Sequence, residues 1–173
     1  FLRTSVHGVI YGSGLEDHYD VLECLHRHWT LLGNEAAVVK ACKDPAIFFP
    51  TLARLGIPHP LVSLTAPQGS GEHENWLIKR TGASGGGHIN IPGKDARISA
   101  HHYFQKKLTG RSLSVVFLAD TLNATIVGTN EMWTVAPEKN DFRYSGAVIQ
   151  PDLPEATART LADIVRVLVR ELG

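Results

Sequence analysis

A glycine-rich segment follows a lysine-bearing apolar stretch, and together they have the residue types that bind phosphate groups. The segment reads "TGASGGGH" (residues 81–88), and Lys79 lies just before it in "WLIKR". Glycines let backbone N–H groups approach an anion closely and adopt positive φ angles, while a nearby ammonium balances the phosphate charge. Ser84 adds a hydroxyl. The pattern lacks the Gly-Lys-Ser/Thr of a Walker P-loop.

Two other structures suit the same segment, namely a flexible linker and a plain hairpin tip. Flexible linkers usually run longer and have polar flanks. This segment is short and lies between two strand-like stretches, which favours a hairpin tip that folds down. The segment by itself leaves the phosphate loop and the plain hairpin open.

Histidines, cysteines and tryptophans give weaker signals. His26 and His28 do not share a helix face, and His101 and His102 would point to opposite sides of a strand, so no zinc site is expected. The other candidates are expected to be structural: Cys24 and Cys42 as small buried groups, and Trp29, Trp76 and Trp133 as core or interface residues.

The composition is that of an ordinary globular protein. The chain has 173 residues, of which 43% are hydrophobic and 20% charged, and its formal net charge is zero. A balanced charge argues against a nucleic-acid binder, and no apolar run is long enough for a membrane span. We find no signal-peptide pattern, and two cysteines do not make a disulfide framework, so the cytoplasm is the expected compartment.

Helices are expected near the start and strands in the middle. A strand over 6–11 precedes a helix capped by Asp20, and Asn34 caps a second helix that runs to Ala41. The pair Asp44-Pro45 begins a third helix, which Gly56 ends. Pro50 should kink that helix or shift its start. Lys43, just before this start, is either a ligand-binding residue or part of a solvated helix end.

The middle of the chain is mostly strand, and a helix closes it. Asp120–Asn123 should turn a hairpin, and an apolar stripe marks a last helix over 153–172. Strands and helices do not alternate strictly, so an α+β fold with a mainly antiparallel sheet is predicted. The expected strands are 61–64, 76–80, 103–108, 112–120, 124–130 and 141–149.

Several pieces, in this order, resemble the ATP-grasp superfamily. "KDPAIFFPTLARLGIPHP" is similar to its lysine-bearing helix and following turn, "WLIKRTGASGGGHI" to its strand lysine and lid, and "YFQKKLTGRSLSVVFLAD" to the segment joining its two lobes. They lie within residues 34–130. "GVIYGSGLED" resembles the end of the family's preceding α/β domain, and "GTNEMW" and "FRYSGAV" fit more loosely. The narrower resemblance is to the group that includes tyramine–glutamate ligase.

The resemblance implies a nucleotide site, which we carry over residue by residue. Lys43 and Lys79 match the lysines that contact ATP phosphates. The backbone carbonyl of Lys106 and N–H of Leu108 match the groups that recognise adenine at the hinge. The full set of implied ATP-binding residues is Lys43, Lys79, Gly82, Ser84, Gly85, Gly86, Gly87, His88, Gln105, Lys106, Lys107 and Leu108.

The chain departs from the family pattern in two respects. An acidic residue that often binds the ribose is missing near the hinge, where Lys106 and Ser112 stand. The Mg²⁺ ligands, an acid and a Glu-x-Asn pattern, are expected beyond Gly173. The first residue is Phe1 rather than Met. We therefore expect a fragment with an incomplete ATP-grasp fold that does not turn over alone, because phosphoryl transfer depends on metal ions.

The expected organisation is the end of an α/β domain (1–35), a first subdomain with the lid (36–104), and the hinge with part of a second (105–173). The implied function of the intact protein is ATP-dependent ligation of a small carboxylate to an amine or thiol through an acyl phosphate. A homo-oligomer is left open. The alternatives are a non-catalytic nucleotide-binding or assembly module and a plain α+β domain. "GSGLED" (12–17) is either a helix cap or a segment facing substrate.

Overall fold

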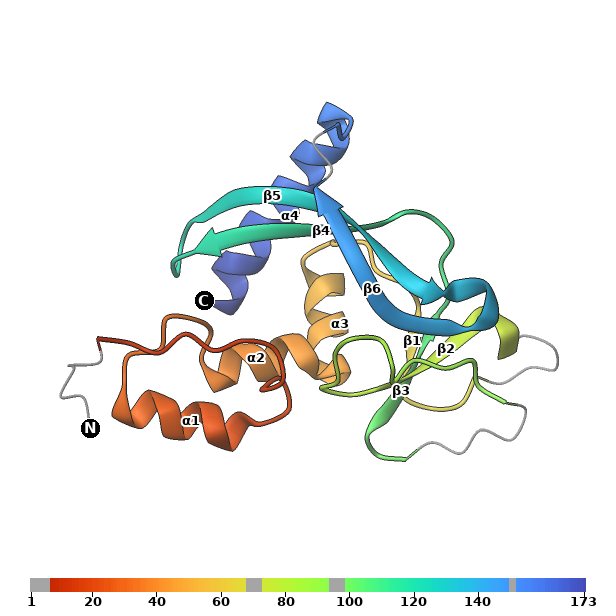
Figure 1. The fold of residues 1–173 in the computed structure, drawn as a ribbon, viewed down its shortest axis with the longest axis horizontal. Coiled ribbons are helices and arrows are strands. Elements are labelled where there is room, and N and C mark those ends of the chain that lie inside the picture. Colours follow the sequence, from red (N-terminus) through yellow and green to blue (C-terminus); the bar gives the residue numbers. More distant parts are fainter. Residues whose placement is uncertain (1–6, 68–72, 94–98, 150–151) are drawn as a thin grey trace.

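Three helices and a small sheet form the first part of the chain, and a second sheet with a long helix forms the rest (Figure 1). The computed structural model describes residues 7–67, 73–93, 99–149 and 152–173. The helices of the first part are α1 (Tyr19–His28), α2 (Ala36–Lys43) and α3 (Pro45–Arg54). The predicted α+β class is confirmed.

The segment before α1 differs from the prediction. Of the strand expected over 6–11, residue 6 lies outside the described residues, and the others form only a single parallel bridge between Val9 and Leu31. A strand is stable only when several of its residues pair with a neighbouring strand, and here Leu31 alone provides a partner. Asp20 lies inside α1, whose N-cap is His18 without a side-chain cap bond. The N-cap position of α2 is Glu35 rather than Asn34, also without a side-chain cap bond.

The boundaries of α3 follow the sequence signals. The Asp44 side chain accepts a hydrogen bond of 2.9 Å from the N–H of Ala46, as the Asp-Pro start predicts. Gly56 has φ +68° and ends the helix, and the N–H of Ile57 bonds to the carbonyl of Leu52 in a Schellman arrangement. Pro50 does not shift the start of the helix, which runs on through it to Arg54.

The first sheet is antiparallel, with the order β1-β3-β2. Its strands are β1 (Val62–Ser63), β2 (Trp76–Arg80), which follows the short 3₁₀ helix η1 (His73–Asn75), and β3 (His102–Lys106). Register pairs Lys79 with Tyr103 and Trp76 with Lys106. β3 ends at Lys106, two residues earlier than predicted, so Lys107 and Leu108 lie beyond the strand.

The buried apolar side chains of this part of the chain come from the three helices and the first sheet. Phe104 on β3 is fully buried. Trp76 and Leu77 on β2, the strand paired with β3, are also buried. Leu22, Val39 and Leu52 are the buried residues of α1, α2 and α3. This core fixes β2 and β3 relative to each other, and those two strands carry Lys79, Gln105 and Lys106 of the expected nucleotide-binding residues.

The second sheet is antiparallel with the order β4-β5-β6. Its strands are β4 (Ser112–Ala119), β5 (Ala124–Ala136) and β6 (Asp141–Ile149), with the 3₁₀ turn η2 (Pro137–Lys139) before β6. The predicted hairpin is confirmed, since Asp120 Oδ1 accepts hydrogen bonds from the N–H groups of Leu122 and Asn123. β5 is longer than predicted because its first part (residues 124–132) pairs with β4 and its last part (residues 130–136) pairs with β6.

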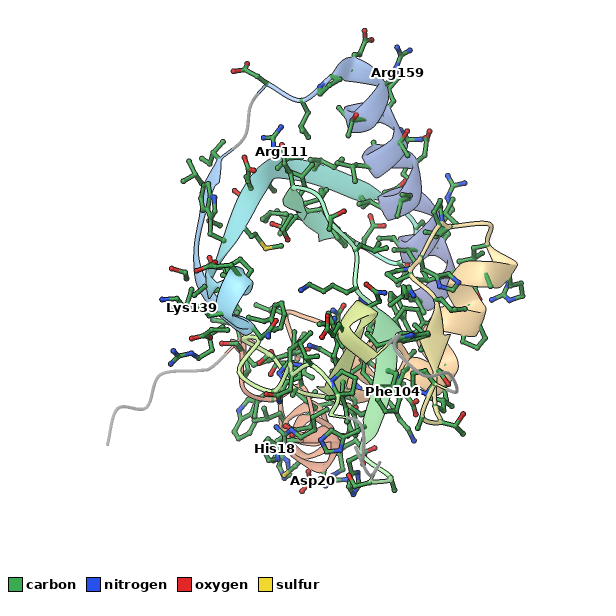
Figure 2. All side chains as sticks on the ribbon, turned by 90° about the vertical axis from the view of Figure 1, so that its right-hand side faces the viewer. His18, Asp20, Phe104, Arg111, Lys139 and Arg159 are labelled. Carbon is green, nitrogen blue, oxygen red and sulfur yellow. The ribbon has the colours of Figure 1, made fainter. Side chains whose placement is uncertain are left out.

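The last helix, α4 (Glu155–Leu172), packs against β5 through the predicted apolar stripe, with Val165 and Val169 buried. An ion pair between Arg54 and Glu171 joins α4 to α3. Figure 2 shows Phe104 in the first part of the chain and Arg111 and Arg159 beside the second sheet and α4. Among the described residues, no helix has the length and apolar character to cross a membrane.

Candidate nucleotide site

Lys79 and Gln105 meet on one face of the first sheet. Lys79 Nζ donates a hydrogen bond of 3.0 Å to Gln105 Oε1. Lys79 on β2 pairs with Tyr103, and Gln105 lies two residues further along β3, so both side chains stand on the same face. Lys79 is half-buried, and this burial lowers its pKa below the usual value. A partly desolvated ammonium is strongly attracted to an anion.

The glycine loop (residues 81–89) leaves β2 and returns along it. An antiparallel bridge joins Ile78 to Asn90, with hydrogen bonds of 2.8 and 3.0 Å. Gly82, Gly85 and Gly86 have φ angles of +76°, +73° and +79°, which side-chain-bearing residues rarely adopt. The loop is therefore a structured hairpin tip and not a flexible linker.

The glycine loop also contacts β6 of the second sheet. The carbonyl of Gly85 accepts a hydrogen bond of 2.9 Å from the N–H of Tyr144. A Cβ atom on Gly86 would lie 1.9 Å from the carbonyl oxygen of Phe142, so only glycine fits there. The loop thus bridges the two sheets.

On its other side the glycine loop meets the segment before α1. A Cβ on Gly82 would lie 2.9 Å from the Cβ of Asp17, and Arg80 Nη2 lies 3.8 Å from Asp17 Oδ2. Burial of Glu16 would raise its pKa, but hydrogen bonds from backbone N–H groups, the charge of Lys43 and the Ser84 hydroxyl hold that pKa below its usual value.

"GSGLED" therefore faces the glycine loop, and whether it also faces substrate stays a prediction. Glu16 and Asp17 were not among the expected site residues. A signal for them exists in the sequence, since two acids follow a glycine-rich turn. This signal could not be interpreted from the sequence, because the turn packs against a glycine loop that lies about 65 residues further along the chain.

His88 lies in the glycine loop, where the charges of three cations affect its pKa. Its Nδ1 is buried and has no hydrogen-bond partner among the described residues. Burial lowers the pKa of His88, a backbone contact at Ser84 opposes this, and the charges of Lys79, Arg80 and Lys43 lower the pKa further. We call Lys43, Lys79 and Arg80 the cationic cluster.

The cationic cluster and the glycine loop form an arrangement suited to a polyanion. Lys43 is the last residue of α2, and Lys79 and Arg80 end β2, so two elements place the charges beside one loop. Positive-φ glycines leave backbone N–H groups free of flanking side chains. Together these features can hold a phosphate chain by charge-assisted hydrogen bonds.

The hinge region follows β3 and runs between the two sheets. The N–H of Lys106 donates to the carbonyl of Leu61 and that of Lys107 to Asn75, both at 2.8 Å. Leu108 is 67% exposed, and within the described residues its N–H donates no hydrogen bond. That N–H is therefore available to a ligand, and its expected contact with adenine stays a prediction. The role of the Lys106 carbonyl stays a prediction.

Lysine side chains of the hinge cover two aromatic rings. Lys106 Nζ lies 5.5 Å from the ring centroid of Trp76, and Lys107 Nζ lies 5.6 Å from that of Phe142. Cation–π contacts at such distances are attractive. The second contact links the hinge to β6, the strand that also holds the glycine loop.

The remaining sequence candidates have mixed outcomes. Trp76 is buried as predicted, but Trp29 and Trp133 are exposed. The prediction that Cys24 is buried is wrong, because it lies on an exposed side of α1; Cys42 is partly buried, and burial raises the pKa of its thiol. The part of the chain that the structure describes holds no group of three or more His, Cys, Asp or Glu residues suited to a metal ion.

The sequence matches the ATP-grasp domain family over residues 42–173. This chain belongs to the ATP-grasp domain family. No curated protein matches it in sequence. The ATP-grasp match begins in α2 and includes every residue that we expected to bind ATP, from Lys43 to Leu108.

Solved structures share the fold at low sequence identity. A complex of biotin carboxylase with β-γ-ATP from Campylobacter jejuni has a TM-score of 0.74 and 16% identity, over 96% of this chain and 43% of that chain. A D-alanine-D-alanine ligase from Coxiella burnetii has a TM-score of 0.71 and 14% identity, over 98% and 52%.

A third solved structure, of an ATP-grasp superfamily protein from Archaeoglobus fulgidus, has a TM-score of 0.65 and 19% identity, over 89% of this chain and 44% of that chain. At such identities the likeness shows the fold alone, and the predicted ATP-grasp fold is confirmed. The chain spans about half the length, or less, of these solved structures.

Proposed function

We propose that this ATP-grasp chain binds ATP between its two sheets, with the phosphates under the glycine loop. The observation that carries the proposal is the position of Lys79: its ammonium has the neutral Gln105 amide as its hydrogen-bond partner, and its strand leads directly into a loop with three positive-φ glycines. The buried Nδ1 of His88, inside the same loop, has no hydrogen-bond partner among the described residues, which suits a site that binds a ligand. The triphosphate of ATP has the size and charge for such a site.

The chain's own residues would bind and orient the nucleotide. Lys43 and Lys79 would pair with phosphate oxygens, and loop N–H groups would donate to them. The Leu108 N–H would donate to the adenine ring, and the Lys106 carbonyl would accept from its amino group. The glycine loop, held to β6 by Tyr144, would exclude water from the phosphates.

Magnesium is implied by the family, but the described residues do not fit it. They contain no group of three or more side chains that could hold a metal ion. ATP would bring the metal bound to its phosphates, and further ligands would have to come from outside the described residues. We therefore assign no chemical step to this chain.

For the intact protein we propose ligation of a carboxylate to an amine, in the manner of tyramine–glutamate ligase. A carboxylate oxygen attacks the γ-phosphorus, and ADP leaves. The amine nitrogen then attacks the acyl carbon, phosphate leaves, and the nitrogen loses a proton. We keep the division into an end of an α/β domain (1–35), a first subdomain (36–104) and part of a second (105–173) as part of this proposal.

A non-catalytic nucleotide-binding module is the second candidate. It is favoured by the residues near the hinge, where Lys106 and Ser112 stand in place of an acid that would bind the ribose. The ligase and the non-catalytic module predict different results when the intact protein is assayed for turnover of ATP. Release of ADP that depends on both a carboxylate and an amine supports the ligase, and nucleotide binding without such release supports the module.

Calorimetric titration of the chain with Mg-ATP tests the proposal. We expect saturable binding that Lys79→Met weakens by roughly 10- to 100-fold, because a charge-assisted hydrogen bond contributes about 1.5–3 kcal/mol. Lys40→Met is the matched control, since Lys40 is an exposed lysine on α2. Absence of binding, or equal weakening by both variants, would contradict the proposed site.

A further inference from the structure

A pocket lies where the glycine loop meets the turn into β6. Its volume is about 250 Å³, enough for a small molecule of amino-acid size. Neither the cationic cluster nor the hinge residues line it. Its lining residues are Gly86, Gly87, Ile89, Asn90, Asn140, Asp141, Phe142 and Arg143.

Arg143 is the cationic group of this pocket, and Asp141 holds it in place. Arg143 Nε donates to Asp141 Oδ1 at 2.9 Å, and Nη2 donates to Oδ2 at 2.6 Å. The backbone N–H of Arg143 donates to the same carboxylate at 3.2 Å. The hydrogen bonds and charge of this pair raise the pKa of Arg143 and lower that of Asp141.

One edge of the guanidinium remains available. Asp141 occupies the edge formed by Nε and Nη2, while Nη1 donates no hydrogen bond within the described residues. A guanidinium presents a second edge, Nη1 with Nη2, that matches the two oxygens of a carboxylate. Since Asp141 already fixes the rotamer, a ligand binding there loses less free energy to side-chain ordering.

The glycine loop is part of the same wall. A Cβ on Gly87 would lie 3.6 Å from Arg143 Cγ, which places the arginine stem against the loop. The next residue, Tyr144, donates its N–H to Gly85. A ligand held by Arg143 would therefore lie beside the loop that covers the proposed phosphate site.

The net charge of the pocket lining favours a singly charged anion over a triphosphate. Asp141 and Arg143 sum to no net charge, and Asn90 and Asn140 add only neutral amides. A singly charged carboxylate suits this wall, whereas a triphosphate is better matched by Lys43, Lys79 and Arg80. The oxygens of a carboxylate that is hydrogen-bonded to an arginine are also poorly placed to attack phosphorus, so the bound carboxylate would not be the reacting one.

We propose that this pocket binds, through Arg143, a carboxylate group of a small substrate that the reaction does not consume. Amino acids are the substrate class that fits best, because their ammonium group can pair with Asp141 while the carboxylate pairs with Arg143. The inference rests on the proposed function, since it places a ligase substrate next to ATP. Arg143 is a substrate-binding residue and Asp141 its positioning residue.

Thermal unfolding of the chain tests this inference, because a ligand bound only by the folded state raises the melting temperature. The probes are the common amino acids, succinate and glutarate, each with and without Mg-ATP. Decarboxylated counterparts, such as ethylamine for alanine and isobutylamine for valine, serve as matched ligands. The variants are Arg143→Gln and, as control, Arg166→Gln, which loses a similar exposed pair with Asp163 on α4.

We expect at least one carboxylate probe to stabilise the parent chain and Arg166→Gln, and its decarboxylated counterpart to have no effect. Its affinity for Arg143→Gln should fall by about tenfold or more. The inference is overturned if no carboxylate stabilises the parent chain, or if Arg143→Gln responds like the control. It is also overturned if Arg143→Gln loses the Mg-ATP response, because Arg143 then serves the nucleotide. A parent chain that does not respond to Mg-ATP contradicts the proposed function instead.

Discussion

The ammonium group of Lys79 on β2 lies 3.0 Å from the side-chain oxygen of Gln105 on β3. A neutral amide is a weak partner for a half-buried ammonium, and burial lowers the pKa of Lys79. The positive charge is therefore costly to the folded chain until a stronger anion binds. A half-buried charge with only a neutral partner is typical of a binding site, where affinity for a ligand is gained at the expense of stability.

Substitution of Lys79 should separate binding from stability. Lys79→Met removes the buried charge but keeps much of the side-chain volume, so we expect an unchanged or higher melting temperature together with the loss of Mg-ATP affinity. Differential scanning fluorimetry, with and without Mg-ATP, measures both. A large fall in melting temperature without ligand would instead make Lys79 a structural residue.

Two neighbouring glycines test the contact between the glycine loop and β6. Gly85 and Gly86 both have positive φ, so alanine at either position should cost about 1–2 kcal/mol from the backbone. A Cβ on Gly86 also meets the Phe142 carbonyl at 1.9 Å, whereas nothing lies within 4 Å of a Cβ on Gly85. Gly86→Ala should therefore release the loop and Gly85→Ala should not.

Hydrogen exchange of the Tyr144 amide measures this release, because that N–H donates to Gly85. We expect faster exchange at Tyr144 and in residues 82–88 of Gly86→Ala than in Gly85→Ala. Equal exchange in the two variants would mean that the loop does not depend on its contact with β6.

His88 should make the stability of the chain depend on pH. Its pKa in the folded chain lies below the unfolded value of 6.5, so the unfolded chain takes up a proton first as the pH falls. The free energy of unfolding should therefore decrease as the pH is lowered from about 6.5 through the folded pKa. His88→Asn should remove this component.

Urea unfolding of the parent chain and His88→Asn between pH 8 and pH 5 checks the sign, with conditions chosen around the usual histidine pKa of about 6.5. The difference between the two chains cancels the contribution of the other histidines. A difference that stays constant over this range would show that His88 titrates normally in the folded chain.

Phe104 is the residue on which the first sheet depends most. It is fully buried on β3, the central strand, so Phe104→Ala should cost about 3–5 kcal/mol in the free energy of unfolding. Phe117 on β4 is 40% exposed, and Phe117→Ala should cost clearly less. Urea unfolding measures both, and similar losses would mean that the second sheet contributes as much to the core as the first.

Local signals predicted most elements of the fold. Asp44, Pro45 and Gly56 set the limits of α3 through capping and backbone geometry, which depend on neighbouring residues alone. The hairpin at Asp120–Asn123 is similarly local. The strand expected near Val9 was wrong because strand formation requires partners elsewhere in the chain, and only Leu31 pairs with it.

The sequence indicated only the part of the candidate nucleotide site whose residues are neighbours along the chain. Lys79 and the glycine loop are adjacent in sequence, so their pattern is visible. The contacts of Gly86 with Phe142 and of Asp17 with Gly82 join segments more than 50 residues apart, and no local pattern encodes them. The pocket around Arg143 depends on the first of these contacts and could be recognised only in the folded chain.

The most direct test of the central claim is to map Mg-ATP onto the chain by the amide shifts of a ¹⁵N-labelled sample. We predict that the largest changes occur in two groups, the amides of residues 82–88 and the amide of Leu108, because the phosphates and the adenine would contact these two places. Lys79→Met should reduce the changes in both groups at the same Mg-ATP concentration. Changes confined to other surfaces, or no changes at all, would contradict the claim that this chain binds ATP under its glycine loop.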